Sequence, residues 1–128
     1  MIDISSLTSI YPLPVRELYA TTKHFNKFLN IGFGYKYTDI QFLTVKPGYV
    51  QSQFNDYRPL DNLTITGQQC AAFALKNLGV VKELFGPKPH VFTGLLVELM
   101  TSIPVWLIMP FEQRLRKLFK DRKQDTTN

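Results

Sequence analysis

Residues 5–23 read SSLTSIYPLPVRELYATTK, and this segment organises the interpretation of the whole chain. A serine, Ser6, is followed by Tyr19 and then, four residues later, by Lys23. Because four residues make about one helical turn, the phenol and the amine leave the same face of a helix. The serine precedes that helix, in a loop with two prolines. The pattern predicts a hydroxyl, a phenol and an ammonium group that converge on one point.

Such a trio suits the protonation of a carbonyl oxygen while hydride reaches the carbonyl carbon. A phenol with a pKa of about 10 is a poor acid–base group at neutral pH. An ammonium group one turn away favours the phenolate and so makes proton transfer easier. A serine hydroxyl can donate a hydrogen bond to the same oxygen and hold the substrate.

Three short motifs occur in the order expected of the short-chain dehydrogenase/reductase family, which the chain resembles. They are ISS at residues 4–6, YATTK at 19–23 and VKPGYVQS at 45–52. The resemblance implies that Ser6, Tyr19 and Lys23 are catalytic. Ser5 competes with Ser6, but the thirteen-residue spacing back from Tyr19 gives Ser6. PLP at residues 12–14 and the hydrophobic C-terminal part resemble membrane-bound very-long-chain 3-oxoacyl-CoA reductases and 17β-hydroxysteroid dehydrogenases within that family.

The third motif is similar to the Pro-Gly-x-Val-x-Thr segment of the family, which meets the nicotinamide end of the cofactor. Ser52 replaces the threonine and keeps its hydroxyl. The lysine of the catalytic trio would also bind the nicotinamide ribose. The cofactor-binding residues that the resemblance implies are Tyr19, Lys23, Pro47, Gly48, Val50 and Ser52.

The order of elements predicts an α/β fold. A short strand at residues 1–4, a helix from 14–15 to 30–34 and a strand at 40–45 imply a right-handed crossover and a parallel sheet. Ligand sites in such sheets lie beyond the carboxyl ends of the strands, where Ser6 and residues 47–48 would meet. Gly32 is expected as the C′ residue of the helix. Helical spacing predicts a core-facing stripe of Leu18, Thr22, Phe25, Phe28 and Leu29.

A second helix is expected at residues 66–78, capped by Thr64 or Thr66. Its buried stripe would contain Cys70, Phe73, Ala74 and Asn77. Residues 50–63 lack a period and are expected to form a flexible loop, which is a substrate lid in the family. The single cysteine excludes an internal disulfide and is interpreted as a buried hydrophobe.

A glycine-rich βαβ unit for the cofactor pyrophosphate is not found. The only close pair, Gly32 and Gly34, follows a helix, and Tyr37 occupies the position of a third glycine. The resemblance therefore covers the C-terminal half of a Rossmann-like doubly wound sheet. We expect NADP(H) to act in a complete enzyme and not to bind tightly to this chain alone.

The composition of the C-terminal residues 91–123 predicts that the chain attaches to a membrane. Residues 91–110 are mostly apolar, but Glu98 and Pro104 favour a hairpin or a kinked interfacial helix over a simple span. A basic amphipathic helix follows at 111–120. Because residues 111–123 supply four of the five net positive charges, the charge does not indicate nucleic-acid binding. His24 and His90 have no ligand partners at metal spacing, and no metal site is expected.

These observations divide the chain into a partial catalytic region (1–90), a membrane-associated segment (91–123) and a polar tail (124–128). The predicted function is that of a partial NADP(H)-dependent oxidoreductase. It would reduce an acyl-CoA or steroid-like carbonyl at the cytosolic face of the endoplasmic reticulum. The oligomeric state is left open, and the resemblance implies a homodimer through the helix of the YATTK motif as one arrangement. The alternatives are a non-catalytic membrane-associated interaction protein derived from such a reductase, or a small membrane subunit with an accidental motif.

Overall fold

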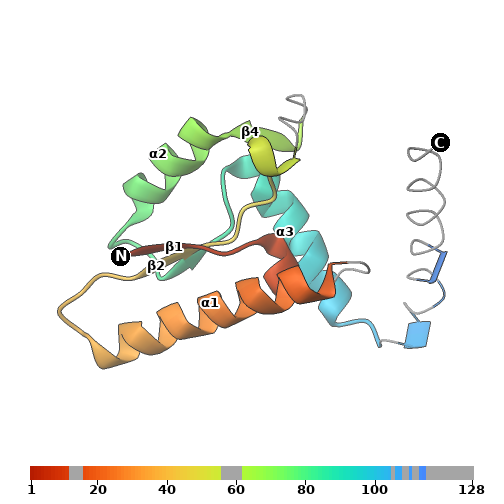
Figure 1. Ribbon diagram of the computed structural model, residues 1–128, viewed down its shortest axis with the longest axis horizontal. Coiled ribbons are helices and arrows are strands. Elements are labelled where there is room, and N and C mark those ends of the chain that lie inside the picture. Colours follow the sequence, from red (N-terminus) through yellow and green to blue (C-terminus); the bar gives the residue numbers. More distant parts are fainter. Residues whose placement is uncertain (12–15, 56–61, 105, 108–109, 111–112, 115–128) are drawn as a thin grey trace.

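The computed structural model describes residues 1–11, 16–55, 62–104, 106–107, 110 and 113–114. It is an α/β fold with a three-stranded parallel sheet in the order β1-β2-β5 and a two-stranded parallel sheet formed by β3 and β4 (Figure 1). The strands are β1 (Ile2–Ile4), β2 (Leu43–Val45), β3 (Tyr49–Gln51), β4 (Thr64–Thr66) and β5 (Glu83–Leu84). The helices are α1 (Glu17–Lys36), α2 (Gly67–Asn77) and α3 (Lys88–Thr101), with 3₁₀ turns η1 (Leu7–Ser9) and η2 (Gln53–Asn55).

The central unit is the predicted strand–helix–strand crossover. Strands β1 and β2 pair in parallel, with Ile2 opposite Leu43 and Ile4 opposite Val45. Helices α1 and α2 lie on opposite sides of these two strands (Figure 1), and both contact β2. Because β2 is covered on both faces, Leu43 and Val45 are completely buried and form the core together with Ala74 of α2. The parallel sheet expected from the sequence is confirmed.

Helix α2 also follows its prediction. Its N-terminus has a capping box, in which the Thr66 hydroxyl accepts from the Gln69 amide and the Gln69 side chain accepts from the Thr66 amide. This exchange satisfies two backbone donors that a helix start leaves unpaired. Cys70 and Ala74 are buried on the face toward β2, and Phe73 and Asn77 are half-buried. The single thiol therefore lies in the interior.

Helix α1 differs from its prediction in both length and orientation. It continues through Gly32 and Gly34 to Lys36, and the amide of Tyr37 bonds to Phe33 O to close it. A glycine costs a helix only about 1 kcal/mol, so these two glycines do not end it. The predicted core-facing stripe is wrong: Leu18 is 80% exposed, Phe25 64% and Phe28 59%.

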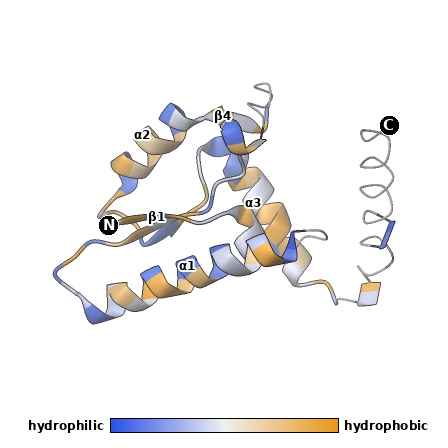
Figure 2. Ribbon diagram, viewed as in Figure 1, coloured by the Kyte–Doolittle hydropathy of each residue, from blue (hydrophilic) through white to orange (hydrophobic). Residues whose placement is uncertain are grey.

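The face of α1 that meets the sheet is largely polar. Ala20 and Asn30 are buried there, and Lys23, His24 and Lys27 are half-buried. Asn30 Nδ2 donates to the Thr44 hydroxyl at 2.7 Å, so a side-chain hydrogen bond joins α1 to the centre of β2. The apolar periodicity of α1 is real, but its residues are exposed rather than packed against the sheet. Figure 2 shows the hydrophobic residues of α1 along the helix. Periodicity alone could not distinguish the two faces.

One more correction concerns the loop expected at residues 50–63. Its first two residues belong to β3, which pairs in parallel with β4 from Tyr49 opposite Thr64 to Gln51 opposite Thr66. The central part of the expected lid, residues 56–61, lies outside the described residues. Helix α3 begins at Lys88, with Pro89 in its first turn.

Helix α3 ends at Thr101, three residues before Pro104. Much of its apolar surface is uncovered, with Phe92 65%, Leu95 56% and Leu99 64% exposed (Figure 2). Within the part of the chain that the structure describes, no helix is both long and apolar enough to cross a bilayer. Of the basic amphipathic helix expected at 111–120, only residues 113–114 are among those described.

Candidate active site

The segment that follows β1 lies beside the segment that follows β2. The Ser5 amide donates to Val45 O at 2.8 Å, and the Leu7 amide donates to Pro47 O at 3.0 Å. Both segments leave the carboxyl ends of their strands, which is where parallel sheets place their ligand sites. The structure therefore brings the ISS and VKPGYVQS motifs together at one edge of the sheet.

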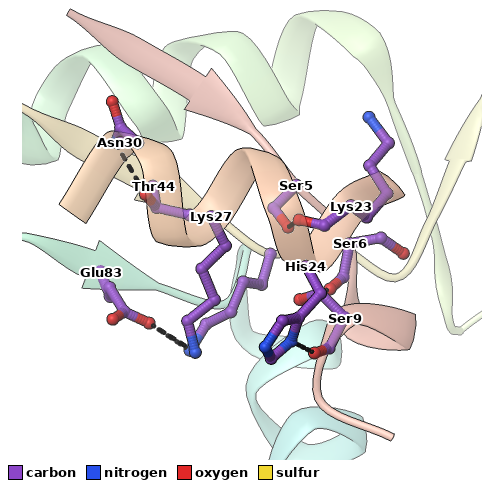
Figure 3. A network of polar contacts seen from close by, with 10 residues as sticks. Ser5, Ser6, Ser9, Lys23, His24, Lys27, Asn30, Thr44 and Glu83 are labelled. Carbon is purple, nitrogen blue, oxygen red and sulfur yellow. Dashed lines mark hydrogen bonds and ion pairs between the residues drawn. The ribbon is translucent and has the colours of Figure 1, made fainter. Parts of the chain in front are cut away.

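Helix α1 is fastened to this edge at Lys23. The Ser5 hydroxyl donates to the carbonyl of Lys23 at 2.8 Å (Figure 3). Lys23 Nζ donates to the carbonyl of Ile4 at 2.8 Å. These two bonds, one to the Lys23 carbonyl and one from its Nζ atom, fix the position of the lysine relative to the end of β1. An ammonium group has three donors, and among the described residues only one N–H group of Lys23 is used in a hydrogen bond. In the same region, burial raises the pKa of the Asp3 carboxyl, and the charge of Lys23 opposes that rise.

Ser6 is buried and acts as the N-cap of η1. Its hydroxyl oxygen accepts from the Thr8 amide at 3.2 Å and from the Thr8 hydroxyl at 3.0 Å. Among the described residues, the Ser6 hydroxyl donates to no acceptor, so its proton is available for a substrate oxygen. Ser5, the competing serine, donates its proton to Lys23 O. The local bonds therefore favour Ser6 over Ser5 as a substrate donor.

Tyr19 is half-buried in the first turn of α1 and stacks on Phe54 of η2. The two ring centroids are 5.6 Å apart with an interplanar angle of 21°. The Nζ atom of Lys23 lies 5.9 Å from the centroid of the Tyr19 ring. A surface cleft of about 450 Å³ opens here, and it is lined by Arg16, Glu17, Leu18, Tyr19 and Phe54. Tyr19 therefore lines an open surface cleft, to which neither Ser6 nor Lys23 contributes.

The structure unites the predicted trio only in part. Lys23 is close to Tyr19 and bound to the end of β1, whereas no hydrogen bond among the described residues joins the Tyr19 hydroxyl to Ser6 or Lys23. Such bonds are often long or absent without a bound substrate and tighten only in its complex. The structure therefore links Lys23 to both the end of β1 and the Tyr19 ring, but it shows no contact between Tyr19 and Ser6 among the described residues.

The predicted cofactor segment contains a glycine that the packing requires. A Cβ atom on Gly48 would lie 3.0 Å from His90 Cδ2 and 3.4 Å from Leu7 Cδ1. Pro47 is buried, and Val50 and Ser52 are half-buried. The main chain of this segment therefore approaches both η1 and α3 closely, and its path is set by contacts on two sides.

Two histidines hold the site together in ways that the sequence did not predict. His24 Nδ1 lies 2.6 Å from Ser9 O, so α1 is also bonded to the end of η1 (Figure 3). His90 is almost fully buried, and its Nε2 lies 3.2 Å from both Tyr49 O and Leu63 O. Only the burial pattern of the folded chain reveals these contacts, because each histidine stands alone in the sequence. Among the described residues, no three His, Cys, Asp or Glu side chains gather as metal ligands.

A charged cluster lies below this edge of the sheet. Lys46 Nζ is 2.8 Å from Glu83 Oε2, and Lys27 Nζ is 3.5 Å from the same oxygen (Figure 3). The side chain of Lys46 is only 7% exposed and lies over the Phe85 ring. Burial raises the pKa of the Glu83 carboxyl, but the hydrogen bond and charge of Lys46, aided by Lys27, outweigh it and hold that pKa below its usual range. The cluster joins α1, the end of β2 and β5.

Comparison with known proteins identifies oxidoreductases of similar sequence. The 17-beta-hydroxysteroid dehydrogenase type 3 of Danio rerio is 26% identical over 126 residues, which cover 95% of this chain and 40% of the relative. The very-long-chain 3-oxoacyl-CoA reductase of Anas platyrhynchos is 26% identical over 126 residues, which cover 96% of this chain and 40% of the relative. The very-long-chain 3-oxoacyl-CoA reductase-B of Danio rerio is 26% identical over 131 residues, which cover 96% of this chain and 42% of the relative.

The chain thus spans about two fifths of the length of these relatives. No family model matches it, and no solved structure matches it. The sequence similarity supports a relation to the short-chain dehydrogenase/reductase family and, more broadly, to carbonyl oxidoreductases. The parallel α/β architecture is consistent with part of a Rossmann-like fold.

Proposed function

From this relation, we propose that the chain supplies the catalytic part of an NADP(H)-dependent reductase. The observation that carries the proposal is the pair of main-chain bonds, from Ser5 to Val45 and from Leu7 to Pro47, that places the two motif-bearing segments side by side. Helix α1 brings Tyr19 and Lys23 to the same edge. We propose that a carbonyl substrate bound there meets the Tyr19 phenol, the Lys23 ammonium group and the Ser6 hydroxyl.

Each member of the trio has a distinct task in the proposed reaction. Tyr19 gives its proton to the carbonyl oxygen, because an alkoxide cannot build up in the transition state without an acid. The Lys23 ammonium, held by Ile4 O, stabilises the phenolate that forms on Tyr19. Ser6 donates its hydroxyl proton to the same oxygen and orients the carbonyl.

The residues present fit the nicotinamide end of the proposed cofactor. The two remaining N–H donors of Lys23 suit ribose hydroxyls, and Ser52 presents a hydroxyl group at the end of the 47–52 segment. When bound, NADPH supplies the hydride. The sequence has no Gly-x-Gly-x-x-Gly turn between a strand and a helix, so no cradle for the pyrophosphate is proposed in this chain. We therefore propose only weak binding of the whole cofactor to residues 1–128.

The proposed substrate is the carbonyl of an acyl-CoA or of a steroid, after the names of the relatives. The exposed apolar face of α1 offers a surface for a second copy of the chain. Membrane attachment through residues 91–123 would place the reaction at the cytosolic face of the endoplasmic reticulum.

A chimera tests the proposed function. Residues 1–128 replace the segment that they match in the Anas platyrhynchos reductase, and NADPH oxidation is followed with a long-chain 3-oxoacyl-CoA and with a 17-keto steroid. Turnover of one of these substrates is expected. A folded chimera that binds NADPH but reduces neither substrate would contradict the proposal and favour a non-catalytic interaction protein.

Helix α3 carries a separate prediction about membranes. The full chain is expected to float with vesicles that contain about one fifth phosphatidylserine, because apolar helix faces and basic segments bind anionic bilayers together. The double variant Phe92→Asp/Leu99→Asp should lose most of this binding, since both residues are exposed on α3.

Leu75→Asp is the matched control, because Leu75 is 66% exposed on α2 and lies outside the proposed membrane surface. Equal binding of the wild type and both variants in a flotation assay would remove α3 from this role.

A further inference from the structure

His90 is the most deeply buried titratable side chain that the proposed reaction leaves unused among the described residues. It lies near the start of α3 with only 1% of its surface exposed. Its Nε2 atom is 3.2 Å from Tyr49 O and 3.2 Å from Leu63 O. Because both partners are carbonyl oxygens, Nε2 carries the proton and donates to both. One N–H group therefore bridges two segments that are far apart in the sequence.

The bridge lies at the start of the small sheet. Tyr49 is the first residue of β3 and pairs with Thr64, the first residue of β4. Leu63 directly precedes that residue. His90 thus bonds to the main chain at the start of the β3–β4 pair, on the side of each strand, and it connects that pair to α3.

Main-chain atoms of two glycines lie close to the imidazole ring of His90. A Cβ atom on Gly86 would lie 2.4 Å from His90 Nδ1, and one on Gly48 would lie 3.0 Å from His90 Cδ2. The imidazole therefore fits between the main chains of two glycines. Its Nδ1 atom has no hydrogen-bond partner among the described residues, so the imidazole is tied to its surroundings through Nε2 alone.

We propose that His90 is a positioning residue that holds residues 47–52 in place. Its role for the cofactor rests on the proposed function, in which this segment contacts the nicotinamide. The neutral ring fixes the Tyr49 carbonyl from one side, while the Leu7 amide fixes the Pro47 carbonyl from the other. The segment is thereby clamped between α3 and η1.

Protonation would disturb this arrangement. Burial lowers the pKa of His90, and its bonds to the Leu63 and Tyr49 carbonyls only partly offset that effect. On the packed elements, β4 and both glycines carry no charge, the Tyr49 phenol is half-exposed, and Lys88 on α3 is exposed. Glu83 of β5 is already paired with Lys46. Among the residues that the structure describes, no other carboxylate contacts the ring, so a proton on Nδ1 would find no counter-charge there.

The sign of the pH effect follows from the direction of the shift. The unfolded chain binds the proton at a higher pH than the folded chain does. The stability that neutral His90 contributes is therefore present above the ordinary histidine pKa of 6.5 and is lost as the pH falls toward the lower folded value.

The test uses the 128-residue chain and two variants, His90→Phe and His24→Phe. Phenylalanine fills the volume of the ring without the Nε2 donor. Amide hydrogen exchange by NMR is measured in β3, β4 and α2. In His90→Phe, exchange in β3 and β4 is expected to accelerate by about tenfold, the effect of one lost hydrogen bond. Exchange in α2 should remain at the wild-type rate.

His24→Phe, which also loses a histidine bond to a carbonyl, should leave β3 and β4 unchanged. Long-range proton–nitrogen spectra of the wild type should show the Nε2-protonated tautomer at neutral pH. Unchanged exchange in His90→Phe, or equal acceleration in all three elements, would overturn the proposal, because the latter marks a general loss of stability.

A second measurement separates this inference from the proposed function. Reduced nicotinamide mononucleotide, which has only the nicotinamide half of the cofactor, is titrated into the wild type and His90→Phe. Amide shifts at residues 48–52 are expected in the wild type and should be much smaller in the variant. Absence of shifts in the wild type would count against the proposed function, while the exchange rates would still decide the role of His90.

Discussion

Replacing Tyr19 by phenylalanine in the chimera is expected to lower kcat/KM by about 100- to 10,000-fold, the usual contribution of a general acid. The change removes one oxygen atom from a half-buried ring. Stacking on Phe54 at 5.6 Å needs only the ring, so the local structure should persist. The loss should therefore fall mainly on kcat, because a proton is needed only as the carbonyl oxygen becomes negative.

Tyr35→Phe is the matched control for this variant. Tyr35 lies on the same helix and is 74% exposed, so removal of its hydroxyl should leave kcat and the unfolding temperature unchanged. Lys23→Met should also reduce kcat, because it removes the ammonium group from the phenol. If Tyr19→Phe retained the activity of Tyr35→Phe, Tyr19 would not be the proton donor.

Replacing Glu83 by alanine is expected to lower the free energy of unfolding by about 3 kcal/mol, because it leaves a buried lysine without its counter-charge. Lys46 is 6% exposed and donates to Glu83 Oε2 at 2.8 Å. Lys27 shares the same carboxylate oxygen, so two positive charges would face each other after the change. Urea unfolding followed by circular dichroism measures the effect.

Two further variants show whether the stability lost in Glu83→Ala comes from charge or from packing. Glu98→Ala removes an exposed carboxylate from α3 and should change the stability by about 0.5 kcal/mol or less. The double variant Lys46→Met/Glu83→Leu should recover most of the stability, because an apolar pair of similar volume needs no counter-charge. A double variant as unstable as Glu83→Ala would show that the cluster acts through packing and not through charge.

The pH dependence of Glu83 has a definite sign. Its folded pKa is depressed, so the unfolded chain takes up the proton first as the pH falls. The stability from this cluster is present above the ordinary carboxyl pKa of 4.5 and is lost as the pH decreases through the folded value. It should thus remain intact over the range in which His90 begins to titrate.

The sequence predicted the strands and helices that are specified by a few neighbouring residues. The β-branched and aromatic residues before Lys46 indicated β2, and a threonine at residue 64 or 66 was expected to cap α2. Each of these signals depends on a few neighbouring residues. The parallel pairing of β1 with β2 followed from the helix between them, because a parallel pair needs a long crossover.

The orientation of α1 could not be predicted in the same way. Leu18, Phe25 and Phe28 follow helical spacing, yet the sheet is met by Ala20, Asn30 and the stems of two lysines. A hydrophobic period shows that a face will be covered, but it does not show what covers it. The choice was made by partners in the fold, such as the Thr44 hydroxyl bound to Asn30.

Only the residues of the candidate site that belong to a motif could be predicted from the sequence. The order of the three motifs predicted that Ser6 and residues 47–48 share one edge of the sheet. The side chains that secure this edge, His24, His90 and Glu83, form no motif. Their partners are 15, 41 and 37 residues away, so only the folded chain brings them together.

The interior position of Cys70 has a practical consequence. Burial raises the pKa of this thiol, so the reactive thiolate is scarce at neutral pH. The chain has no other cysteine, so disulfide scrambling within one molecule is impossible. A maleimide or a chromogenic disulfide should therefore react slowly with Cys70 in the folded chain, and the rate of labelling would report how often α2 opens.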